Sequence, residues 1–544
     1  MKTIKNTILL LALSLGAVSC NQYLDINENP NAAHIEDITP AFVFPGAASE
    51  IHRIQTAGDG SMMHYGSLMA NNWGSNVYAF SGFFSREFNL STVDASFYSG
   101  IWSTIYFQSA NLKLIEEYPN ADHKQDYYVA MAKILKAFYM QYIVDLYGDA
   151  PYSDAFGRGL NTKPKYDDDK EIYKALINDI DNGIALINAG NIDAISPGGT
   201  DVIFGGNMTN WKAFANTIKL RMLLRMSNVT GDMATFRDAK LATLPSSTAA
   251  YITQNVVVNP GYSNATAEKM NPFLAAYRIS ATALIPQAYN QITASEHIAL
   301  ALNGNRFGSV QPYSSNPIYT KFNNITDPRS TRLFTAINYQ GFPQVKGVRQ
   351  GASSGDPGAP LDVTTVSKFG TGTFAGSTTV TSNAQLISAG NARGGMIMSL
   401  AEAKFLQAEA ALRYPSLFSG GSARFEEGID ASGVWLGANM ATYKTQIATR
   451  EGLGWTGSNT QILESIMTQK WLALANVSPI ESFLDFLRTG YPATPMPVGA
   501  SVANKPYRLM YPITEFSANS ENVPNITSAQ LFVKNQYTPF WNQN

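Results

Sequence analysis

Residues 123–149 read HKQDYYVAMAKILKAFYMQYIVDLYGD and carry the clearest structural signal in the chain. Apolar side chains recur at steps of three and four, from Tyr128 through Leu135 to Leu146, which is the spacing of one face of an α-helix. Gly148 follows directly and suits a helix end. The stretch therefore predicts a long amphipathic helix that ends near Gly148.

The same periodicity appears elsewhere. In residues 207–227, Thr209 or Asn210 can cap a helix that is buried through Trp211 and Phe214. Alanine-rich residues 399–413 would let neighbouring helices approach closely, as in tetratricopeptide repeats, although the strict signature of that repeat is absent. We expect a mostly α fold of irregular helix pairs. Further helices are predicted at 97–117, 171–188, 232–242, 396–413, 460–476 and 479–489.

The pattern changes between about 246 and 395. This region is dense in Gly, Ser, Thr and Pro, and its second half shows no helical stripe. Long loop regions in compact proteins usually serve a function. We predict one domain over residues 41–544, with helical blocks at about 41–245 and 396–544 and a loop-rich, partly β insertion between them.

Composition limits the classes of function. The chain has 544 residues, 45% of them hydrophobic and 15% charged, which is typical of a globular protein with a substantial core. A net charge of −2 gives no basic field for nucleic acid. Cys20 is the single cysteine, so the chain can form no internal disulfide and no thiolate metal site.

The N-terminus has the pattern of an exported lipoprotein. Lys2 and Lys5 precede an apolar stretch at 8–15, which is too short to span a bilayer that needs about twenty residues. Small residues then lead to Cys20, the position at which a lipoprotein signal is cut and acylated. We predict a signal peptide at 1–19, a lipidated Cys20, and a leash over 20–40. Several acyl chains on Cys20 would anchor the protein stably in a membrane.

Seven segments occur along the chain in an order that resembles the SusD/RagB family of outer-membrane lipoproteins, in its SusD-like branch. Together they span nearly the whole mature chain. They are DLYGDAPYSDAF (145–156), WKAFANTIKLRMLLR (211–225), DPR (327–329), SLAEAKFLQAEA (399–410), KWLAL (470–474), ESFLDFLRTGYP (481–492) and RLMYPITEFSANSENV (508–523).

This resemblance implies a specific role. SusD-like proteins are mostly helical, with tetratricopeptide-like pairs on one side and a variable looped side toward the ligand. They are tethered at the cell surface by an N-terminal lipid and bind nutrients, most often oligosaccharides. They act as lids of SusC-like TonB-dependent transporters and are not enzymes. Family members often carry paired arginines and a tryptophan near 481–492, where this chain has Phe483, Leu487 and only Arg488.

The motif residues themselves suit architecture. Asp145, Gly148 and Pro151 fit a helix end and a turn. Arg329 and Arg488 fit buried ion pairs that pin loops to helices, because a planar guanidinium satisfies several acceptors at once.

Ligand contact is expected from aromatic rings in polar, turn-rich context. Residues 71–88 supply Trp73, Tyr78 and Phe83, with Trp73 the first choice because indole offers the broadest stacking face. The alternative is that these rings only fix the loop to the core. A second candidate pair is Tyr313 and Tyr319, whose possible hydroxyl-binding neighbours are Asn305, Arg306 and Gln311.

Other chemistry has weak support. The five histidines show no metal-binding spacing, and no cofactor motif appears, so we predict neither a catalytic metal nor a cofactor. Asp167, Asp168 and Asp169 lack calcium-loop spacing and suit a solvated turn before a helix. Two alternatives stay open. One is a lid with peptide cargo, and the other is a helical glycoside hydrolase using Asp94 beside Glu87.

Overall fold

The computed structural model describes residues 38–76, 82–157, 161–306, 317–339, 341–353, 355 and 365–543. The predicted signal peptide, Cys20, Tyr78, Gln311 and Tyr313 lie outside these residues. The described chain is mostly helical, which confirms the predicted fold class. Its first helices are α2 (Pro40–Thr56), α3 (Met62–Met69), α4 (Ser85–Asn89), α5 (Ser99–Glu116), α6 (Asp126–Tyr147), α7 (Asp169–Ala189), α8 (Met208–Arg225) and α9 (Gly231–Leu241).

Short elements make up the middle of the chain, and longer helices follow. The middle helices are α10 (Pro272–Tyr277), α11 (Gln287–Gln291), α12 (Glu296–Leu302), α13 (Pro317–Thr320), α14 (Ser330–Leu333), α15 (Thr371–Ala375) and α16 (Asn383–Ala392). The later helices are α17 (Leu400–Arg413), α18 (Gly421–Leu436), α19 (Ala441–Ile447), α20 (Asn459–Leu474), α21 (Pro479–Thr489) and α22 (Ile513–Ala518). The strands are β1 (Trp73–Ser75), β2 (Val256–Val258), β3 (Ile292–Ala294), β4 (Ile337–Tyr339), β5 (Phe342–Gln344) and β6 (Gly395–Met398).

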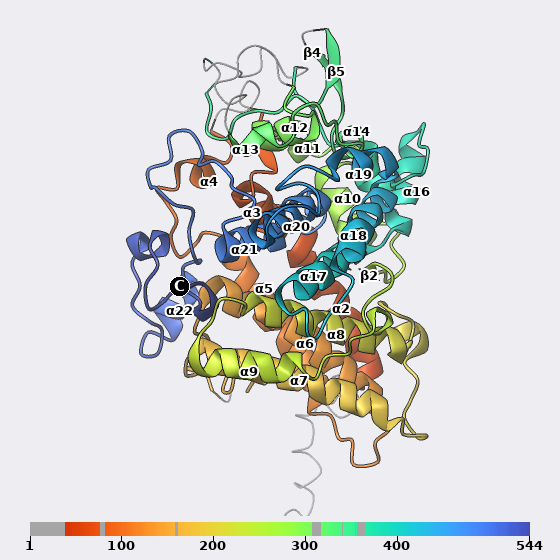
Figure 1. Cartoon of the computed structure of the whole chain (residues 1–544). Coiled ribbons are helices and arrows are strands. Elements are labelled where there is room, and N and C mark those ends of the chain that lie inside the picture. Colours follow the sequence, from red (N-terminus) through yellow and green to blue (C-terminus); the bar gives the residue numbers. More distant parts are fainter. Residues whose placement is uncertain are drawn as a thin grey trace, which may run out of the picture.

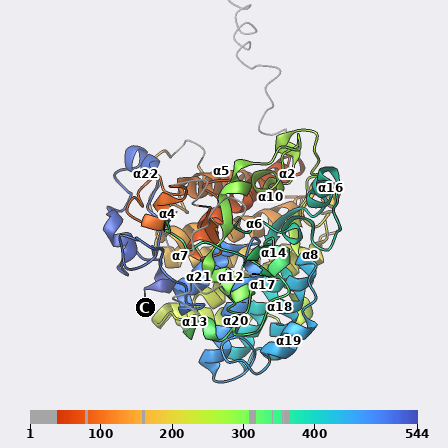
Figure 2. The ribbon, with the colours of Figure 1, turned by 90° about the horizontal axis from the view of Figure 1, so that it is seen from above.

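The helices pack as consecutive pairs. α2, α5, α6, α7 and α8 each contact the next, and α8 contacts α17, which begins the second series of α17, α18, α20 and α21. The first series fills the lower half of Figure 1, the second series and α3 the centre, and α11 to α14 with the β4–β5 hairpin the top. Seen from above, α12 and α13 project over α20 and α21 (Figure 2). The middle of the chain thus covers one end of the helical scaffold.

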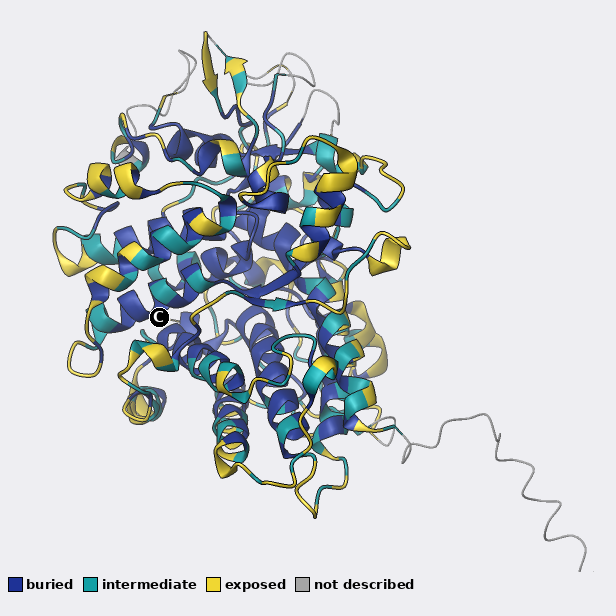
Figure 3. Cartoon of the chain, turned by 90° about the vertical axis from the view of Figure 1, so that its right-hand side faces the viewer, coloured by how far each residue is buried: buried dark blue, intermediate teal, exposed yellow. Residues whose placement is uncertain are grey.

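Helix α6 lies at the centre of the first series. Nearly every residue of α6 is buried, so the predicted stripe is only part of a helix that is enclosed on all sides. Figure 3 shows that other helices differ from α6, because they are buried on their inner faces and exposed on their outer faces. Gly148 follows α6 with a φ of 74°, in the region that favours glycine, which confirms the predicted helix end.

Several predicted boundaries were wrong. α8 is capped by Asn207, whose side chain accepts from the Asn210 amide, and not by Thr209 or Asn210. The helix predicted at 396–413 begins only at α17, because the preceding residues form β6. The stretch read as irregular contains α16, capped by Ser382, which buries Leu386 and Ile387. A helix this short has too few apolar positions to show a periodic stripe.

Two strand pairs fasten the middle region to the scaffold. β1 runs antiparallel to β3, with Trp73 opposite Ala294, and β2 runs antiparallel to β6, with Val256 opposite Met398. β4 and β5 form a hairpin of their own. The β1–β3 pair matters most here, because it brings the first predicted ligand stretch beside the middle region.

A buried ionic network joins the two helical series. Its nine residues come from α6, α8, α17, α20 and α21, and all are nearly inaccessible to solvent. We define it as Asp145, Arg221, Arg225, Glu402, Glu409, Lys470, Glu481, Asp485 and Arg488.

Short ion pairs connect these residues. Arg225 reaches Glu481 at 2.6 Å and Asp145 at 3.2 Å. Arg488 reaches Glu409 at 2.5 Å, and Lys470 reaches Asp485 at 2.7 Å. Charges taken out of water are tolerated only when they are paired in this way.

The two arginines predicted to form buried ion pairs do so. Arg488 belongs to the network, and Arg329 is paired with Asp327 at 2.6 Å while also donating to Gln469. Five of the seven motifs contribute to the network, so these motifs hold the scaffold together.

Candidate functional site

Trp73 does not offer a stacking face. Its indole is fully buried, its N–H donates to Asn476 Oδ1 at 2.7 Å, and its ring packs against Tyr277 and Phe369. The prediction that Trp73 stacks on a sugar is wrong for this structure. The physical reason is that β1 pairs with β3 and draws the ring into the core.

The remaining candidate aromatics are divided. Tyr319 is buried, and its hydroxyl lies 2.9 Å from His297 Nδ1, so its predicted ligand role is also wrong. Phe83 is half-buried and packs on Phe84, with ring centroids 3.9 Å apart, and its role stays a prediction. Of the polar neighbours, Asn305 is half-buried and donates to Asn323, and Arg306 is exposed.

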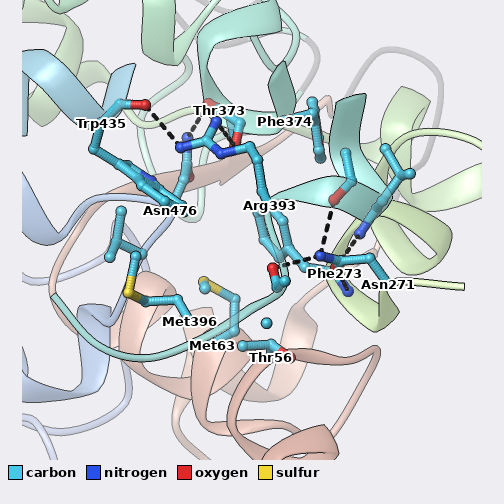
Figure 4. A pocket seen from close by; sticks show the side chains of 15 residues that line it. Thr56, Met63, Asn271, Phe273, Thr373, Phe374, Arg393, Met396, Trp435 and Asn476 are labelled. Atoms are coloured by element: carbon cyan, nitrogen blue, oxygen red, sulfur yellow. Dashed lines mark hydrogen bonds between the residues drawn. The ribbon is translucent and has the colours of Figure 1, made fainter. Parts of the chain in front are cut away.

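A small cavity lies behind Asn476 (Figure 4). Phe273, Phe374 and Trp435 form its aromatic walls, and its volume of about 30 Å³ has room for one or two water molecules and not for a sugar ring. Arg393 stacks over Trp435 at 3.5 Å and donates to the carbonyl oxygen of that residue. Burial, with repulsion from Arg332, lowers the pKa of Arg393 to about 9. This cavity is therefore a small gap between packed segments and not a ligand site.

A wide groove of about 730 Å³ runs between α5, α6 and α7. It is large enough for a sugar, and Tyr152 lies on its wall. However, its charged groups pair with one another. Lys136 contacts Glu116 at 2.7 Å, Lys133 contacts Asp179 at 3.0 Å, and the Tyr152 hydroxyl donates to Asp179 at 2.8 Å. Few polar groups in this groove are left for a ligand.

A different arrangement occurs on the looped side, at α10 and α11. The Arg278 guanidinium lies 4.6 Å from the centroid of the Tyr289 ring, and the Lys368 ammonium lies 5.3 Å from it. Lys368 also donates to Asn290 Oδ1 at 2.6 Å. All four side chains are half-buried. We call Arg278, Tyr289, Asn290 and Lys368 the Tyr289 cluster.

The Tyr289 cluster lies where the loop-rich middle region meets Asn76, a residue of the first predicted ligand stretch. The Asn76 amide donates to the Gln291 carbonyl at 2.9 Å, and the Asn76 side chain donates to the Asn290 carbonyl. Leu284 and Ile285, just before α11, are 69% and 54% exposed. An aromatic ring, an amide, two cations and an apolar ledge are therefore gathered on one surface. Such a surface can stack on the C–H face of a sugar and bond its polar groups.

A second tyrosine–lysine pair adjoins the cluster. The Lys346 ammonium lies 4.8 Å from the Tyr339 ring centroid, and its backbone pairs with Ser367, the residue before Lys368. Burial, with repulsion from Arg349, lowers the pKa of Lys346 to about 8 against the opposing effect of Glu296. Sequence reasoning missed Tyr289. The signal that could have found it is a tyrosine in the polar, proline-led stretch IPQAYNQ.

The acidic residues suggested for hydrolysis are engaged elsewhere. Asp94 is paired with Arg86 at 2.9 Å and accepts from the Ser96 amide. Burial tends to raise the pKa of Asp94, but hydrogen bonds from Ser96 and the charge of Arg86 outweigh it, so the pKa is lowered. Glu87 accepts from the Tyr98 hydroxyl at 2.9 Å. Neither carboxylate is held free toward a groove.

The acidic run before α7 also has structural partners. Asp167 accepts from the amides of Tyr152 and Ser153, and Asp168 caps α7. Asp169 is buried and accepts from the Phe540 amide at 2.8 Å, so the predicted solvated turn is wrong at this residue. Asp168 and Asp169 group with Asp149 closely enough to hold a cation, but their contacts already explain their positions.

Comparison with known proteins identifies the family. A sequence profile of the family described as "Starch-binding associating with outer membrane" matches residues 68–512. The chain belongs to the SusD-like family. No curated protein sequence matches it. No described helix combines the length and apolar character needed to span a bilayer.

Solved SusD-like structures share the fold. A SusD homologue from Bacteroides thetaiotaomicron VPI-5482 aligns with a TM-score of 0.64 at 19% identity, covering 93% of this chain and 99% of its own. A homologue from Bacteroides vulgatus ATCC 8482 gives 0.65 at 20% identity, with 92% and 97% coverage. A chitin-binding homologue from Flavobacterium johnsoniae gives 0.64 at 20% identity, with 92% and 98% coverage.

Proposed function

We propose that this SusD-like protein captures an oligosaccharide at the cell surface and serves as the lid of a SusC-like TonB-dependent transporter. The family match over residues 68–512 carries the proposal, because the family is described as starch-binding and associated with the outer membrane. A structural relative that binds chitin supports the same class of ligand. The lipid on Cys20 and the signal peptide at 1–19 belong to this proposal.

We place the ligand at the Tyr289 cluster. The wide groove has its charges paired, the small cavity is too small, and Trp73 is enclosed. The Tyr289 cluster combines a half-buried ring with the Asn290 amide and two cations. Aromatic stacking supplies contact area, and directed polar groups supply specificity.

The experiment is a binding screen of the chain from Asn21 onward against polysaccharides, oligosaccharides and peptides. Tyr289→Ala should weaken binding to the selected glycan about tenfold or more, because it removes the ring. Tyr507→Ala is the matched control, since Tyr507 is also half-buried and also lies beneath a lysine, Lys534, at 5.8 Å. It should bind as the wild type does. Equal loss in both variants would refute the placement.

The two alternatives have separate outcomes in the same screen. Selection of peptides over every glycan would replace the cargo and keep the lid role. Sustained release of reducing ends from a polysaccharide would establish a hydrolase instead. We propose a binding protein without catalysis, and the engagement of Asp94 by Arg86 supports this.

A further inference from the structure

Charge is distributed unevenly along the chain. Residues 246–395 contain ten Lys and Arg against five Asp and Glu, a net charge of +5. Because the whole chain carries −2, the remainder carries −7. The region that forms the looped side is therefore basic on a protein that is acidic elsewhere, and charge of one sign on a binding face attracts ligands of the other sign.

The buried and paired acidic residues that the structure describes in this region have other partners than the Tyr289 cluster. Asp327 is buried against Arg329, and Glu296 is paired with Arg349 at 3.2 Å. Among the described residues, neither Arg278 nor Lys368 forms an ion pair with a carboxylate. Two cations thus lie beside one tyrosine ring without a counter-charge from any residue that the structure describes.

This arrangement has an electrostatic cost. Partial burial, together with repulsion from Arg278, lowers the pKa of Lys368. Burial and repulsion from Arg349 also lower the pKa of Lys346, whose backbone pairs with Ser367, against the opposing effect of Glu296. A bound anion would offset the repulsion between Arg278 and Lys368 and would gain charge-assisted hydrogen bonds.

We propose that the ligand of the Tyr289 cluster is an acidic oligosaccharide, one whose sugars carry carboxylate or sulfate groups. This inference rests on the proposed function. The planar fork of Arg278 suits two oxygens of one carboxylate or sulfate, and Lys368 supplies a point charge beside it. The Tyr289 ring and the exposed Leu284 and Ile285 offer apolar contact to the sugar ring that bears the acid.

The test compares matched glycans that differ only in charge. The chain from Asn21 onward is titrated with oligogalacturonate and with its fully methyl-esterified form, and with chondroitin sulfate and its desulfated, carboxyl-reduced form. We expect at least tenfold tighter binding to the acidic member of one pair, and weaker binding as salt is raised, because exposed charges are screened. Equal affinity within both pairs would overturn the inference.

Two charge reversals locate the effect. Lys368→Glu and Arg278→Glu should each reduce the preference for the acidic glycan over its neutral counterpart about tenfold or more, because each replaces a cation that would pair with the acid. Lys534→Glu is the control, because Lys534 also lies over a tyrosine and burial also lowers its pKa. Thermal unfolding confirms that each variant is folded. If Lys534→Glu weakened binding as much as Lys368→Glu, the assignment of the acidic ligand to the Tyr289 cluster would be refuted.

The outcomes separate this inference from the function on which it rests. Binding of neutral glycans alone would leave the oligosaccharide lid in place and refute the acidic ligand. Binding of neither class in any pair or in the wider screen would refute both.

Discussion

At the scale of single residues, Asp169 links the start of α7 to the end of the chain. Its carboxylate accepts from the Phe540 amide, and its own amide donates to Asp149 at 3.0 Å. Burial and the nearby charge of Asp149 raise the pKa of Asp169 to about 7. The ionised form is therefore disfavoured in the folded protein relative to the unfolded chain.

The sign of the resulting pH dependence follows. Between the ordinary carboxyl pKa of 3.8 and about 7, the folded state holds a proton at Asp169 that the unfolded state has lost, so stability falls as pH rises. Between pH 5.5 and pH 7.5, the loss of this proton should lower the free energy of unfolding by about 2 kcal/mol. Asp169→Asn should remove that part of the loss while Asn still accepts from Phe540. Chemical unfolding at both pH values measures it.

Asp168→Asn provides the comparison. Asp168 is exposed and also lies at the start of α7, so its substitution tests the cap without the burial. Asp168→Asn should leave the difference in unfolding free energy between pH 5.5 and pH 7.5 as it is in the wild type. If Asp169→Asn kept the full pH dependence, Asp169 would not be its source.

At the scale of elements, sequence reasoning succeeded where helices are long. The spacing in 123–149 located α6 because a long run of turns repeats the same signal. The ion pairs of Arg329 and Arg488 were also predicted correctly, since a buried guanidinium must find acceptors.

Sequence reasoning failed where contacts between distant segments decide whether a side chain is buried and which residues surround it. Trp73 stands in a polar stretch that is typical of a loop, yet its burial depends on β3, more than two hundred residues away. Tyr289 lies in a polar stretch typical of a loop, and its partner Lys368 is 79 residues further along the chain. No local pattern encodes either pairing.

The packing of α3 on α21 depends on a glycine. A Cβ added at Gly66 would lie 2.2 Å from the backbone nitrogen of Ile480 and 2.5 Å from its Cα, so the helices would have to separate. Gly66→Ala should destabilise the protein by about 2 kcal/mol or more, as overpacking does. Denaturant unfolding of the chain from Asn21 onward measures the change.

A second helical glycine separates packing from helix propensity. Gly46 lies on an exposed face of α2, and an added Cβ there would meet nothing within 4 Å. Gly46→Ala should therefore stabilise the protein by up to about 1 kcal/mol, because alanine favours the helix. Destabilisation by Gly66→Ala no larger than that of an average surface substitution would contradict the close approach.

At the scale of the whole molecule, the two helical series form a base, and the proposed binding surface lies at one end of it. The buried ionic network fixes α8 and α17 across the junction of the series. Tyr289 and Asn290 of the Tyr289 cluster lie on α11, which is in the upper part of Figure 1, whereas the helices of the first series fill the lower half. A base held this firmly can present the looped side to a ligand without itself rearranging.

The lipid tether is the last prediction, and it concerns how this base is held at the membrane. Cys20 precedes α2 by about twenty residues, and α2 belongs to the first helical series. A lipid on Cys20 would hold the protein through the scaffold and leave the Tyr289 cluster accessible. Cys20→Ala should move the protein from the membrane fraction to the soluble fraction and abolish labelling by a fatty-acid analogue, because the chain contains no other thiol to acylate. Ser19→Ala, which keeps the thiol and a small residue before it, should remain membrane-bound. Retention of Cys20→Ala in the membrane would show that something other than this lipid anchors the protein.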